Sequence, residues 1–450
     1  MQNRGSLGLA TMGNGLTLIN DQSAANSMVA LALVSRYGLR DGTAREAGQL
    51  RLLGETFFRG TATGMGTETL LERLEALGAT YETRIDMEST QVLMLAPAER
   101  ASELLNLMGE LVCKPAADGA ELKKRKALFM REIRATEDSP SSWVDSHFFE
   151  GSWASGSSLS RPLFGSMAGL GGATPEQLLA LHGTVFDPSR MALVISGGGG
   201  LKERDVEEVF ASLSSGTARI VRAPARWPAS PTSTVRIRST EDGESPMVTL
   251  CASTPMPPLR NAAGALDIRK ARAFDVLQAA LSAGMSGRLF YHVREKRGLV
   301  YSISCSQNIL SDTGLFTMDT WMAPANGPAA LQIAYDQIRA LATGDPATGG
   351  LDARELSKAK AQACARVARR TATALRRGIA FADQWAVGGA VTTPGVRMAQ
   401  LASVTGEEVR DAARALVANL EMTRLVFVAP SDITPALRSA ICGKPQRQVA

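Results

Sequence analysis

Three histidines occur in this chain of 450 residues, and none is placed to bind a metal ion. A catalytic zinc site takes three protein ligands, and two of them often lie four residues apart on one helix. His147, His182 and His292 share no such spacing with each other or with a carboxylate. His147 lies in an aromatic segment, His182 near a predicted helix end, and His292 beside Tyr291. We therefore expect structural or surface roles for all three.

Other reactive groups are also scattered. The five cysteines include no CxxC pair: Cys113, Cys251, Cys305, Cys364 and Cys442. An odd and distant set predicts buried free thiols, not a disulfide framework or a zinc–thiolate site. No G-x-S-x-G elbow occurs. The four glycines at 197–200 lack the G-x-G-x-x-G fingerprint, and Lys202 is not at the Walker position, so a flexible turn after a strand is expected there.

The composition is that of a globular protein, with 45% hydrophobic and 21% charged residues. The net charge of +5 is small and the basic residues are interspersed with acidic ones, which excludes a nucleic-acid-binding footprint. No apolar run of about 18 residues occurs, so no membrane span is expected. The N-terminus lacks the apolar core of a signal peptide. We expect a cytoplasmic protein if Met1 is the natural start, and a periplasmic one if a leader was removed.

Strand and helix signals alternate along the chain, and the same order occurs twice. In the first half, strands are predicted at 29–34, 92–95 and 191–195, and helices at 45–58, 67–77, 101–112 and 119–136. In the second half, strands are predicted at 248–251, 299–305, 315–322 and 425–428, and helices at 266–281, 330–341 and 351–378. A segment rich in proline and small residues separates the halves. The prediction is an α+β fold with domains at 1–220 and 241–450, joined by a linker at 221–240.

Two segments carry a family resemblance. Residues 48–61, GQLRLLGETFFRGT, resemble the zinc helix of the insulinase/pitrilysin metallopeptidases, in which an H-x-x-E-H motif precedes an aromatic residue and a Gly-Thr pair. Residues 70–79 match that family's next helix, which ends in Gly-Ala. Residues 286–301, SGRLFYHVREKRGLVY, resemble its C-terminal signature. The resemblance extends along nearly the whole chain and implies two tandem homologous α/β-sandwich domains of the LuxS/processing-peptidase type.

The chain departs from that family at the zinc helix. Arg51, Gly54 and Glu55 stand where the motif has histidine, glutamate and histidine. Glu132, 77 residues after Glu55, matches the family's third ligand. One carboxylate cannot hold zinc, and the cation on Arg51 opposes it. We expect no metal and no cofactor in this chain, and zinc in a partner subunit.

Arg294 and Tyr301 match a pair that the resembled family uses for catalysis, an arginine and a tyrosine seven residues apart in the second domain. Attack on an amide puts negative charge on the carbonyl oxygen, and a guanidinium and a phenol can both donate hydrogen bonds to it. The resemblance thus implies catalytic roles for both. Local sequence alone also fits a solvated helix end and a half-buried strand. Arg288 and Arg297 are expected to be structural or to steer substrate.

The leading hypothesis is the zinc-free subunit of a heterodimeric metallopeptidase that cleaves peptides, with a homologous H-x-x-E-H subunit as partner. The alternative is a non-enzymatic structural subunit that resembles the core proteins of the respiratory bc1 complex, although such a subunit needs neither Arg294 nor Tyr301. A self-sufficient homodimeric hydrolase lacks a plausible nucleophile. Residues 281–287 lack the long glycine-rich loop of the mitochondrial processing peptidase's non-catalytic subunit, so presequence recognition by that loop is not expected. Neither nucleic acid nor a membrane is expected as a partner.

Overall fold

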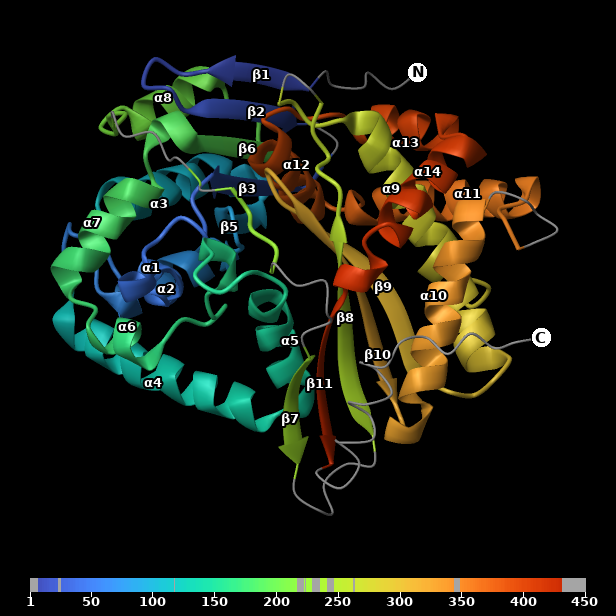
Figure 1. Cartoon of the computed structure of the whole chain (residues 1–450). Coiled ribbons are helices and arrows are strands. Elements are labelled where there is room, and N and C mark those ends of the chain that lie inside the picture. The colour runs from blue at the N-terminus through green and yellow to red at the C-terminus, as the bar shows by residue number, and fades with distance from the viewer. Residues whose placement is uncertain are drawn as a thin grey trace. The chain divides into compact units, whose positions relative to one another are not determined.

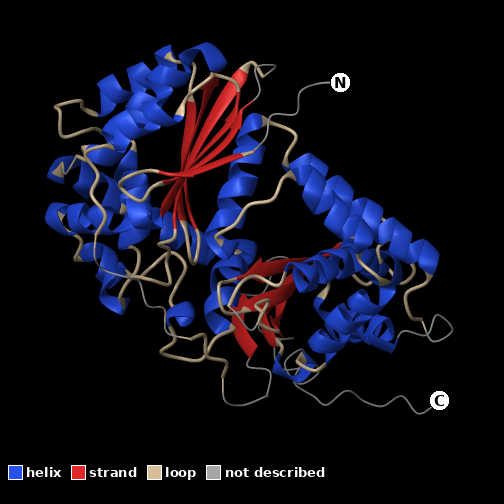
Figure 2. Cartoon of the chain, turned by 90° about the horizontal axis from the view of Figure 1, so that it is seen from above, coloured by secondary structure: helices blue, strands red, loops and turns tan. Residues whose placement is uncertain are grey.

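The chain forms two compact units, each built around one β-sheet (Figure 1). The computed structural model describes residues 7–22, 26–116, 118–216, 222, 224–228, 235–240, 247–261, 264–343 and 349–430. Unit 1 comprises Met1–Arg134, Arg161–Ala223 and Ala368–Pro394, and unit 2 comprises Ala135–Ser160, Pro224–Val367 and Gly395–Ala450. Helices lie on both faces of each sheet (Figure 2). The predicted α+β class is confirmed.

The sheet of unit 1 has the strand order β1-β2-β6-β3-β5-β4 in the described residues. Its strands are β1 (Gly8–Thr11), β2 (Thr17–Gln22), β3 (Met28–Ser35), β4 (Thr80–Ile85), β5 (Thr90–Pro97) and β6 (Met191–Gly197). Strand β2 pairs in parallel with β6, and all other pairs are antiparallel. The three predicted strands are confirmed as β3, β5 and β6, the adjacent and most apolar ones. Their continuous apolar runs suit strands that are buried on both faces.

The sheet of unit 2 repeats this topology, with the order β7-β11-β8-β10-β9 in the described residues. Its strands are β7 (Val235–Thr240), β8 (Val248–Met256), β9 (Ser302–Ile309), β10 (Gly314–Met322) and β11 (Arg424–Pro430). Strand β7 pairs in parallel with β11, as β2 does with β6, and the other pairs are antiparallel. The repeat predicted from element order is therefore present in the sheet topology. Strand β7 lies inside the segment 221–240 that was predicted as a linker, so the predicted linker was longer than the one in the structure.

One face of the unit 1 sheet is covered by helices from the first half of the chain. They are α1 (Gln49–Phe57), α2 (Thr67–Ala76), α3 (Ala101–Cys113), α6 (Met167–Gly171), α7 (Pro175–Val185) and α8 (Glu203–Phe210), with the N-terminal part of α4 (Gly119–Asp138). The odd-numbered residues 29, 31 and 33 of β3 face this layer, as the period of two in a strand requires. The helices predicted over α1 to α4 are confirmed within a few residues.

One face of the unit 2 sheet is covered in the same way by helices from the second half of the chain. They are α9 (Ile268–Ser282), α10 (Gly327–Thr343), α11 (Ala353–Arg370), α13 (Pro394–Ser403) and α14 (Gly406–Val417). Helices α10 and α14 pack against each other, and α14 packs against α9. The buried apolar side chains of this layer form the core of unit 2.

The second face of each sheet is covered by a helix from the other half of the chain. Helix α12 (Ala374–Gly388) packs on β3 and β6 of unit 1, where Phe381 and Trp385 join the core. Helix α5 (Pro140–Gly151) packs on β8 and β11 of unit 2, where Val144 joins the core. The two units therefore do not follow the predicted boundaries 1–220 and 241–450, because each contains one helix from beyond them.

The helicity predicted over 351–378 is confirmed, but two helices and not one occupy that range. Helix α11 ends at Arg370, and α12 begins at Ala374. The hydroxyl of Thr373 accepts a hydrogen bond from the backbone N–H of Arg376, which caps the start of α12. Thr373 has extended backbone angles, so the helical path is interrupted there. The break allows α11 and α12 to pack in different units.

The first three of the glycines at 197–200 pack closely against neighbouring chain segments in the turn that ends β6. A Cβ atom at Gly197 would lie 2.2 Å from the carbonyl oxygen of Met28, and one at Gly198 would lie 2.2 Å from that of Asn26. Gly197 and Gly199 also have positive φ angles of 102° and 101°. Glycine at these positions therefore permits close backbone approach and a left-handed turn.

Candidate functional site

Helix α1 carries the degenerate zinc motif on one face. Residues three and four apart share a helix face, so Arg51, Gly54 and Glu55 lie together. The buried residues of the helix, which anchor it to the core of unit 1, are Gln49, Leu50, Leu52, Leu53 and Phe57. This division explains why α1 keeps its place although the motif has lost its ligand residues.

The groups around Arg51 are ones that stabilise a cation: a carbonyl oxygen, an aromatic ring and carboxylates. Its Nε donates a hydrogen bond to the carbonyl oxygen of Leu163 at 2.5 Å, and its Cζ lies 4.9 Å from the ring centroid of Phe164. Burial lowers the pKa of Arg51, and three carboxylates near it raise that pKa: Asp86, Glu132 and Glu55. Glu132 on α4 thus lies close enough to act on the charge of α1. A guanidinium is present where the family's motif has an imidazole.

Gly54 occupies the position of the motif's general base, and the space for a side chain there is taken. A Cβ atom at Gly54 would lie 2.8 Å from Cδ1 of Ile85 and 3.1 Å from Oγ1 of Thr83. A side chain at this position would therefore have to displace Ile85. Across the described residues, no group of three or more His, Cys, Asp or Glu side chains could hold a metal ion. The residues on α1 do not fit zinc.

His182 on α7 is buried in the core of unit 1, with 5% of its surface exposed. Its ring lies 4.6 Å from that of Phe186 and is stacked at 6.3 Å on that of Phe57. Its Nε2 atom has no hydrogen-bond partner among the described residues. Burial lowers the pKa of His182 to about 4. The imidazole is therefore neutral and packs as an aromatic ring.

The other two histidines also belong to local packing. His147 on α5 stacks on Trp143 at 4.3 Å, and its Nδ1 lies 2.9 Å from the carbonyl oxygen of Trp143. Its Nε2 lies 3.6 Å from a carboxylate oxygen of Glu137, a pairing that the sequence spacing did not predict. His292 contacts Tyr291 edge to face, and burial together with nearby arginines lowers its pKa. Neither residue joins a group of metal ligands.

The described cysteines are free thiols of low reactivity. Cys251 and Cys305 are buried, and Cys113 and Cys364 are half-buried. Burial raises the pKa of all four thiols, to about 12 for Cys305. A thiol with a raised pKa is a poor nucleophile, since only the thiolate reacts. Cys442 lies outside the described residues.

Arg294 and Tyr301 lie together on unit 2. Arg294 is on the short π-helix η5 (Phe290–Glu295), and Tyr301 directly precedes the edge strand β9. The Cζ of Arg294 lies 5.4 Å from the ring centroid of Tyr301 and 4.7 Å from that of Phe290. Tyr301 is 61% exposed. Within the described residues, neither the Arg294 guanidinium nor the Tyr301 hydroxyl has a hydrogen-bond or ion-pair partner, so their donors are unused.

Arg288 and Arg297 differ from Arg294 in this respect. The guanidinium of Arg288 donates to both carboxylate oxygens of Glu355, at 2.6 and 2.5 Å, and to two backbone carbonyl oxygens at 349 and 350. The Arg288 side chain therefore stabilises the fold of unit 2 through these hydrogen bonds. Arg297 donates from Nη1 to the carbonyl oxygen of His292 at 2.9 Å, which closes the turn after η5.

Trp321 on β10 belongs to the same cluster, and sequence reasoning missed it. Its ring centroid lies 4.8 Å from that of Tyr301, at an interplanar angle of 80°, and its carbonyl oxygen accepts a hydrogen bond from the Tyr301 N–H at 2.8 Å. Trp321 is 20 residues from Tyr301 in the sequence, and the β9–β10 register, which pairs Trp321 with Ser302, brings them together. Only a correct hairpin register could have predicted this contact.

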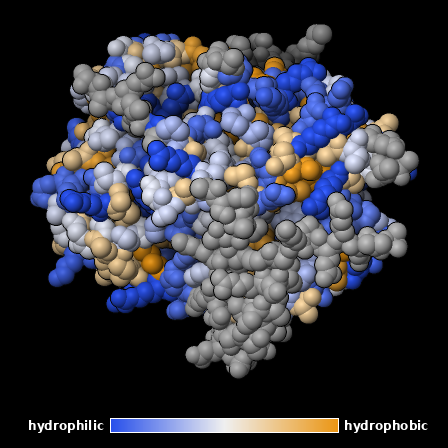
Figure 3. Space-filling view, viewed as in Figure 1, coloured by the Kyte–Doolittle hydropathy of each residue, from blue (hydrophilic) through white to orange (hydrophobic). Residues whose placement is uncertain are grey.

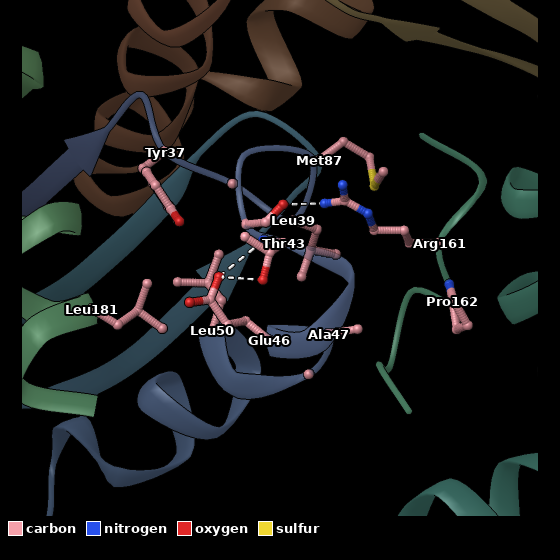
Figure 4. Close-up of a pocket in the computed structure, with 13 residues that line it drawn as sticks. Tyr37, Leu39, Thr43, Glu46, Ala47, Leu50, Met87, Arg161, Pro162 and Leu181 are labelled. Atoms are coloured by element: carbon pink, nitrogen blue, oxygen red, sulfur yellow. Dashed lines mark hydrogen bonds between the residues drawn. The ribbon is translucent and has the colours of Figure 1, made fainter. Parts of the chain in front are cut away.

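A small pocket in unit 1 is separate from these residues (Figure 4). It lies beside the loop ahead of α1, and its charged and polar lining residues include Arg161, Glu46 and Thr43. Arg161 donates to the carbonyl oxygen of Gly42. Glu46 accepts hydrogen bonds from the N–H and the hydroxyl of Thr43, at 3.0 and 2.8 Å. These charged groups already have protein partners.

Hydrophilic residues predominate on the face of the molecule seen in Figure 3, and the hydrophobic residues there form small separate patches. Among the helices that the structure describes, none is both long and apolar enough to cross a membrane.

Comparison with known proteins identifies the family. Residues 17–165 match the family described as insulinase (peptidase family M16), and residues 172–363 match the peptidase M16 inactive domain. The chain belongs to peptidase family M16. Its relatives include a protein from Rickettsia felis named as an uncharacterized zinc protease, 20% identical over 427 residues that cover 94% of this chain and 98% of that one. A Bacillus subtilis protein of similar name is 26% identical over 314 residues, which cover 68% and 72%.

Solved structures of M16 and related proteins share the fold. A protease from Helicobacter pylori superimposes with a TM-score of 0.81 at 14% identity, over 94% of this chain and 99% of that one. The M16 inactive domain from Pseudomonas fluorescens gives 0.80 at 18% identity, over 95% and 98%. A chain of complex III2 from Candida albicans, with Inz-5 bound, gives 0.78 at 16% identity, over 97% and 100%. At these identities the likeness extends to the fold alone.

Proposed function

We propose that this M16 chain is the zinc-free subunit of a heterodimeric metallopeptidase that cleaves peptides. One observation carries the proposal: Arg294 and Tyr301 lie side by side on unit 2, and their donors have no partner in the described protein. The altered α1 helix, with Arg51 and Gly54, supports the zinc-free part of the proposal.

The chemistry assigned to this chain is stabilisation of charge. When a hydroxide attacks a peptide carbonyl, the carbonyl oxygen gains negative charge. The N–H groups of Arg294 and the hydroxyl of Tyr301 donate to this oxygen more strongly than to the neutral carbonyl, and this difference lowers the barrier. Because a guanidinium and a phenol keep their protons at neutral pH, neither competes for the proton of the attacking water. A partner M16 subunit with an intact H-x-x-E-H helix supplies the zinc, the base and the water.

The proposal is tested by purifying the chain alone and together with the M16 protein that it binds in its source organism. An internally quenched peptide and a zinc assay are applied to both samples. We expect no hydrolysis and no stoichiometric zinc for the chain alone, and peptidase activity for the pair that a chelator abolishes and zinc restores. Hydrolysis by the isolated chain, or about one zinc ion bound per isolated chain, contradicts the proposal.

The first prediction concerns the donor pair in the active heterodimer. Arg294→Ala and Tyr301→Phe each remove a donor that acts in the transition state, so kcat falls by about 10²- to 10³-fold. The KM and the affinity for the partner subunit change little, because a peptide's ground state makes weak use of these donors. Arg297→Ala is the matched control, since among the described residues the Arg297 side chain donates only to the backbone carbonyl of His292, and we expect the kcat of this variant to stay at the wild-type value. Wild-type kcat in both donor variants removes their proposed role.

A structural subunit is the second candidate, because the chain of complex III2 from Candida albicans has the same fold. This candidate predicts stable assembly into a larger complex and no peptidase activity with any partner. It gives no role to the unused donors of Arg294 and Tyr301. The assay of the co-purified assembly decides between the two functions.

A further inference from the structure

We infer that Trp321 and Phe290 are positioning residues for the Arg294–Tyr301 pair, an inference that rests on the proposed function. The four side chains form a continuous series. Phe290 lies 4.7 Å from the Arg294 guanidinium, that guanidinium lies 5.4 Å from the Tyr301 ring, and the Tyr301 ring lies 4.8 Å from the Trp321 ring. The reactive pair thus lies between two aromatic side chains that come from a helix and a strand.

The rings hold the Arg294 guanidinium without using its N–H groups. A cation is attracted to the face of an aromatic ring, and this attraction needs no hydrogen bond. A carboxylate partner such as Glu355, which pairs with Arg288, would instead take the donors and neutralise the charge. Phe290 is four residues before Arg294 on η5, so this helix places the ring beside the cation. The arrangement keeps both the donors and the positive charge available.

Trp321 has the corresponding role for Tyr301. Tyr301 is 61% exposed, and a ring this exposed can change its side-chain rotamer unless something packs against it. The Trp321 ring meets the Tyr301 ring nearly at right angles, a favoured aromatic geometry. The hydrogen bond from the Tyr301 N–H to the Trp321 carbonyl oxygen fixes the backbone at the same place. Strand β10 thereby sets the direction in which the Tyr301 hydroxyl points.

The kinetic test uses the active heterodimer and the internally quenched peptide. In Trp321→Leu, Tyr301 keeps its hydroxyl but loses its support, so kcat falls by about 10- to 100-fold with little change in KM. Trp321→Phe restores a ring edge and recovers most of the lost kcat. The double variant Trp321→Leu/Tyr301→Phe is no slower than Tyr301→Phe alone, because Trp321 acts through the Tyr301 hydroxyl. Phe290→Leu lowers kcat in the same way, and Phe290→Tyr recovers it.

Tyr291→Leu is the matched control, because Tyr291 is an exposed aromatic residue of η5 that contacts His292 and not the pair. Its kcat stays at the wild-type value. Wild-type kcat in Trp321→Leu, or an additive loss in the double variant, overturns the inference alone. If Arg294→Ala and Tyr301→Phe also keep wild-type kcat, or if the assembly has no peptidase activity, the proposed function fails and the inference fails with it.

A second measurement needs no partner subunit. The fluorescence of the wild type, of Tyr301→Leu and of Tyr291→Leu is measured with Trp321 present and again with Trp321→Phe added. For each of the three, the difference between the two spectra is the emission of Trp321. We expect Tyr301→Leu to change the intensity or wavelength of this difference spectrum, because the two rings are in contact, and Tyr291→Leu to leave it unchanged. A difference spectrum that is the same with and without the Tyr301 ring overturns the inference, whatever the kinetics show.

Discussion

Arg51, Arg288 and Arg294 are held in three different ways, and the difference sets what each can do. The guanidinium of Arg288 donates hydrogen bonds to Glu355 and to two backbone carbonyl groups, so Arg288 stabilises unit 2. Arg51 is partly desolvated, has a carbonyl and a ring beside it, and lies among carboxylates, so it adds a fixed positive charge where the family's motif binds a metal. Within the part of the chain that the structure describes, the Arg294 guanidinium contacts aromatic rings and has no hydrogen-bond partner, so its donors can act on a substrate.

A second single residue, His182, gives a prediction about how stability depends on pH. The pKa of His182 is about 4 in the folded protein and near 6.5 in an exposed histidine. Between these values the unfolded chain binds a proton that the folded protein does not, so the free energy of unfolding decreases as the pH falls from about 6.5 towards 4. The decrease from pH 7 to pH 5 is about 2 kcal/mol, and above pH 7 this contribution is constant.

Urea unfolding of the wild type and of His182→Phe at both pH values checks this prediction. The substitution keeps an aromatic ring between Phe57 and Phe186 but cannot bind a proton. We expect the variant to lose about 2 kcal/mol less than the wild type between pH 7 and pH 5. An equal loss in both proteins would show that His182 does not titrate as its burial requires.

At the scale of elements, apolar runs and helical spacing predicted the parts of the fold whose own residues determine them. Strands β3, β5 and β6 each contain a continuous apolar run, and α2 and α3 bury a regular stripe, so each was found from its sequence alone. Strands β1 and β4 alternate between exposed and half-buried residues and gave no such signal. Helix α5 was missed, and α12 was read as the end of a longer helix because the Thr373 cap was not recognised. The unit in which each helix packs depends on contacts with distant strands.

Some residues of the candidate site could be predicted from the sequence, and others could not. The spacing of Arg294 and Tyr301 was visible in the sequence because both lie in one short segment. The contact of Trp321 with Tyr301 depends on the register of two strands, and the approach of Ile85 to Gly54 depends on the packing of β4 against α1. Neither can be obtained from residue types and spacing. Tertiary contacts thus supply the residues that support or block a site.

The relation between α1 and α4 gives a prediction about metal binding. If Glu132 faces the ligand positions of α1, the double variant Arg51→His/Glu55→His regains two imidazoles four residues apart and keeps a third ligand. We expect it to bind about one zinc ion per chain without peptidase activity, since Gly54 supplies no general base.

Metal analysis after dialysis measures this, with Glu132→Gln in the double variant as the control. We expect the control to lose the zinc, because two imidazoles alone leave the site one ligand short. A folded double variant that binds no zinc would show that Glu132 does not reach the ligand positions of α1.

At the scale of the whole molecule, the exchange of α5 and α12 makes each unit depend on both halves of the chain. Without α12, the apolar residues of β3 and β6 that face it, such as Val34 and Val194, would be exposed to water. Burial of a side chain such as Phe381 on α12 stabilises the fold by about 1.5–3 kcal/mol, and several such residues are involved. Residues 140–151 of the first half have the same role for the second sheet.

Expression of residues 1–223 and 224–450 as separate chains tests this dependence, because this cut keeps β7 with the sheet of unit 2. Each half alone leaves one sheet face uncovered and carries one helix without its sheet, so we expect each half to aggregate or to lack cooperative thermal unfolding. Co-expression of the two halves restores a soluble 1:1 assembly in which both helices reach their sheets. Two separately soluble halves with sharp unfolding transitions would contradict the prediction.

The position of α12 late in the sequence also affects when unit 1 can complete its folding during translation. The last strand of the first sheet ends at Gly197, but the helix that closes the second face of that sheet begins at Ala374, 177 residues later. At a synthesis rate of about 5–20 residues per second, the ribosome needs about 9 to 35 s to bridge this interval. During that time an apolar face of the sheet stays uncovered, so the first unit reaches its final form only after residues 374–388 have been synthesised.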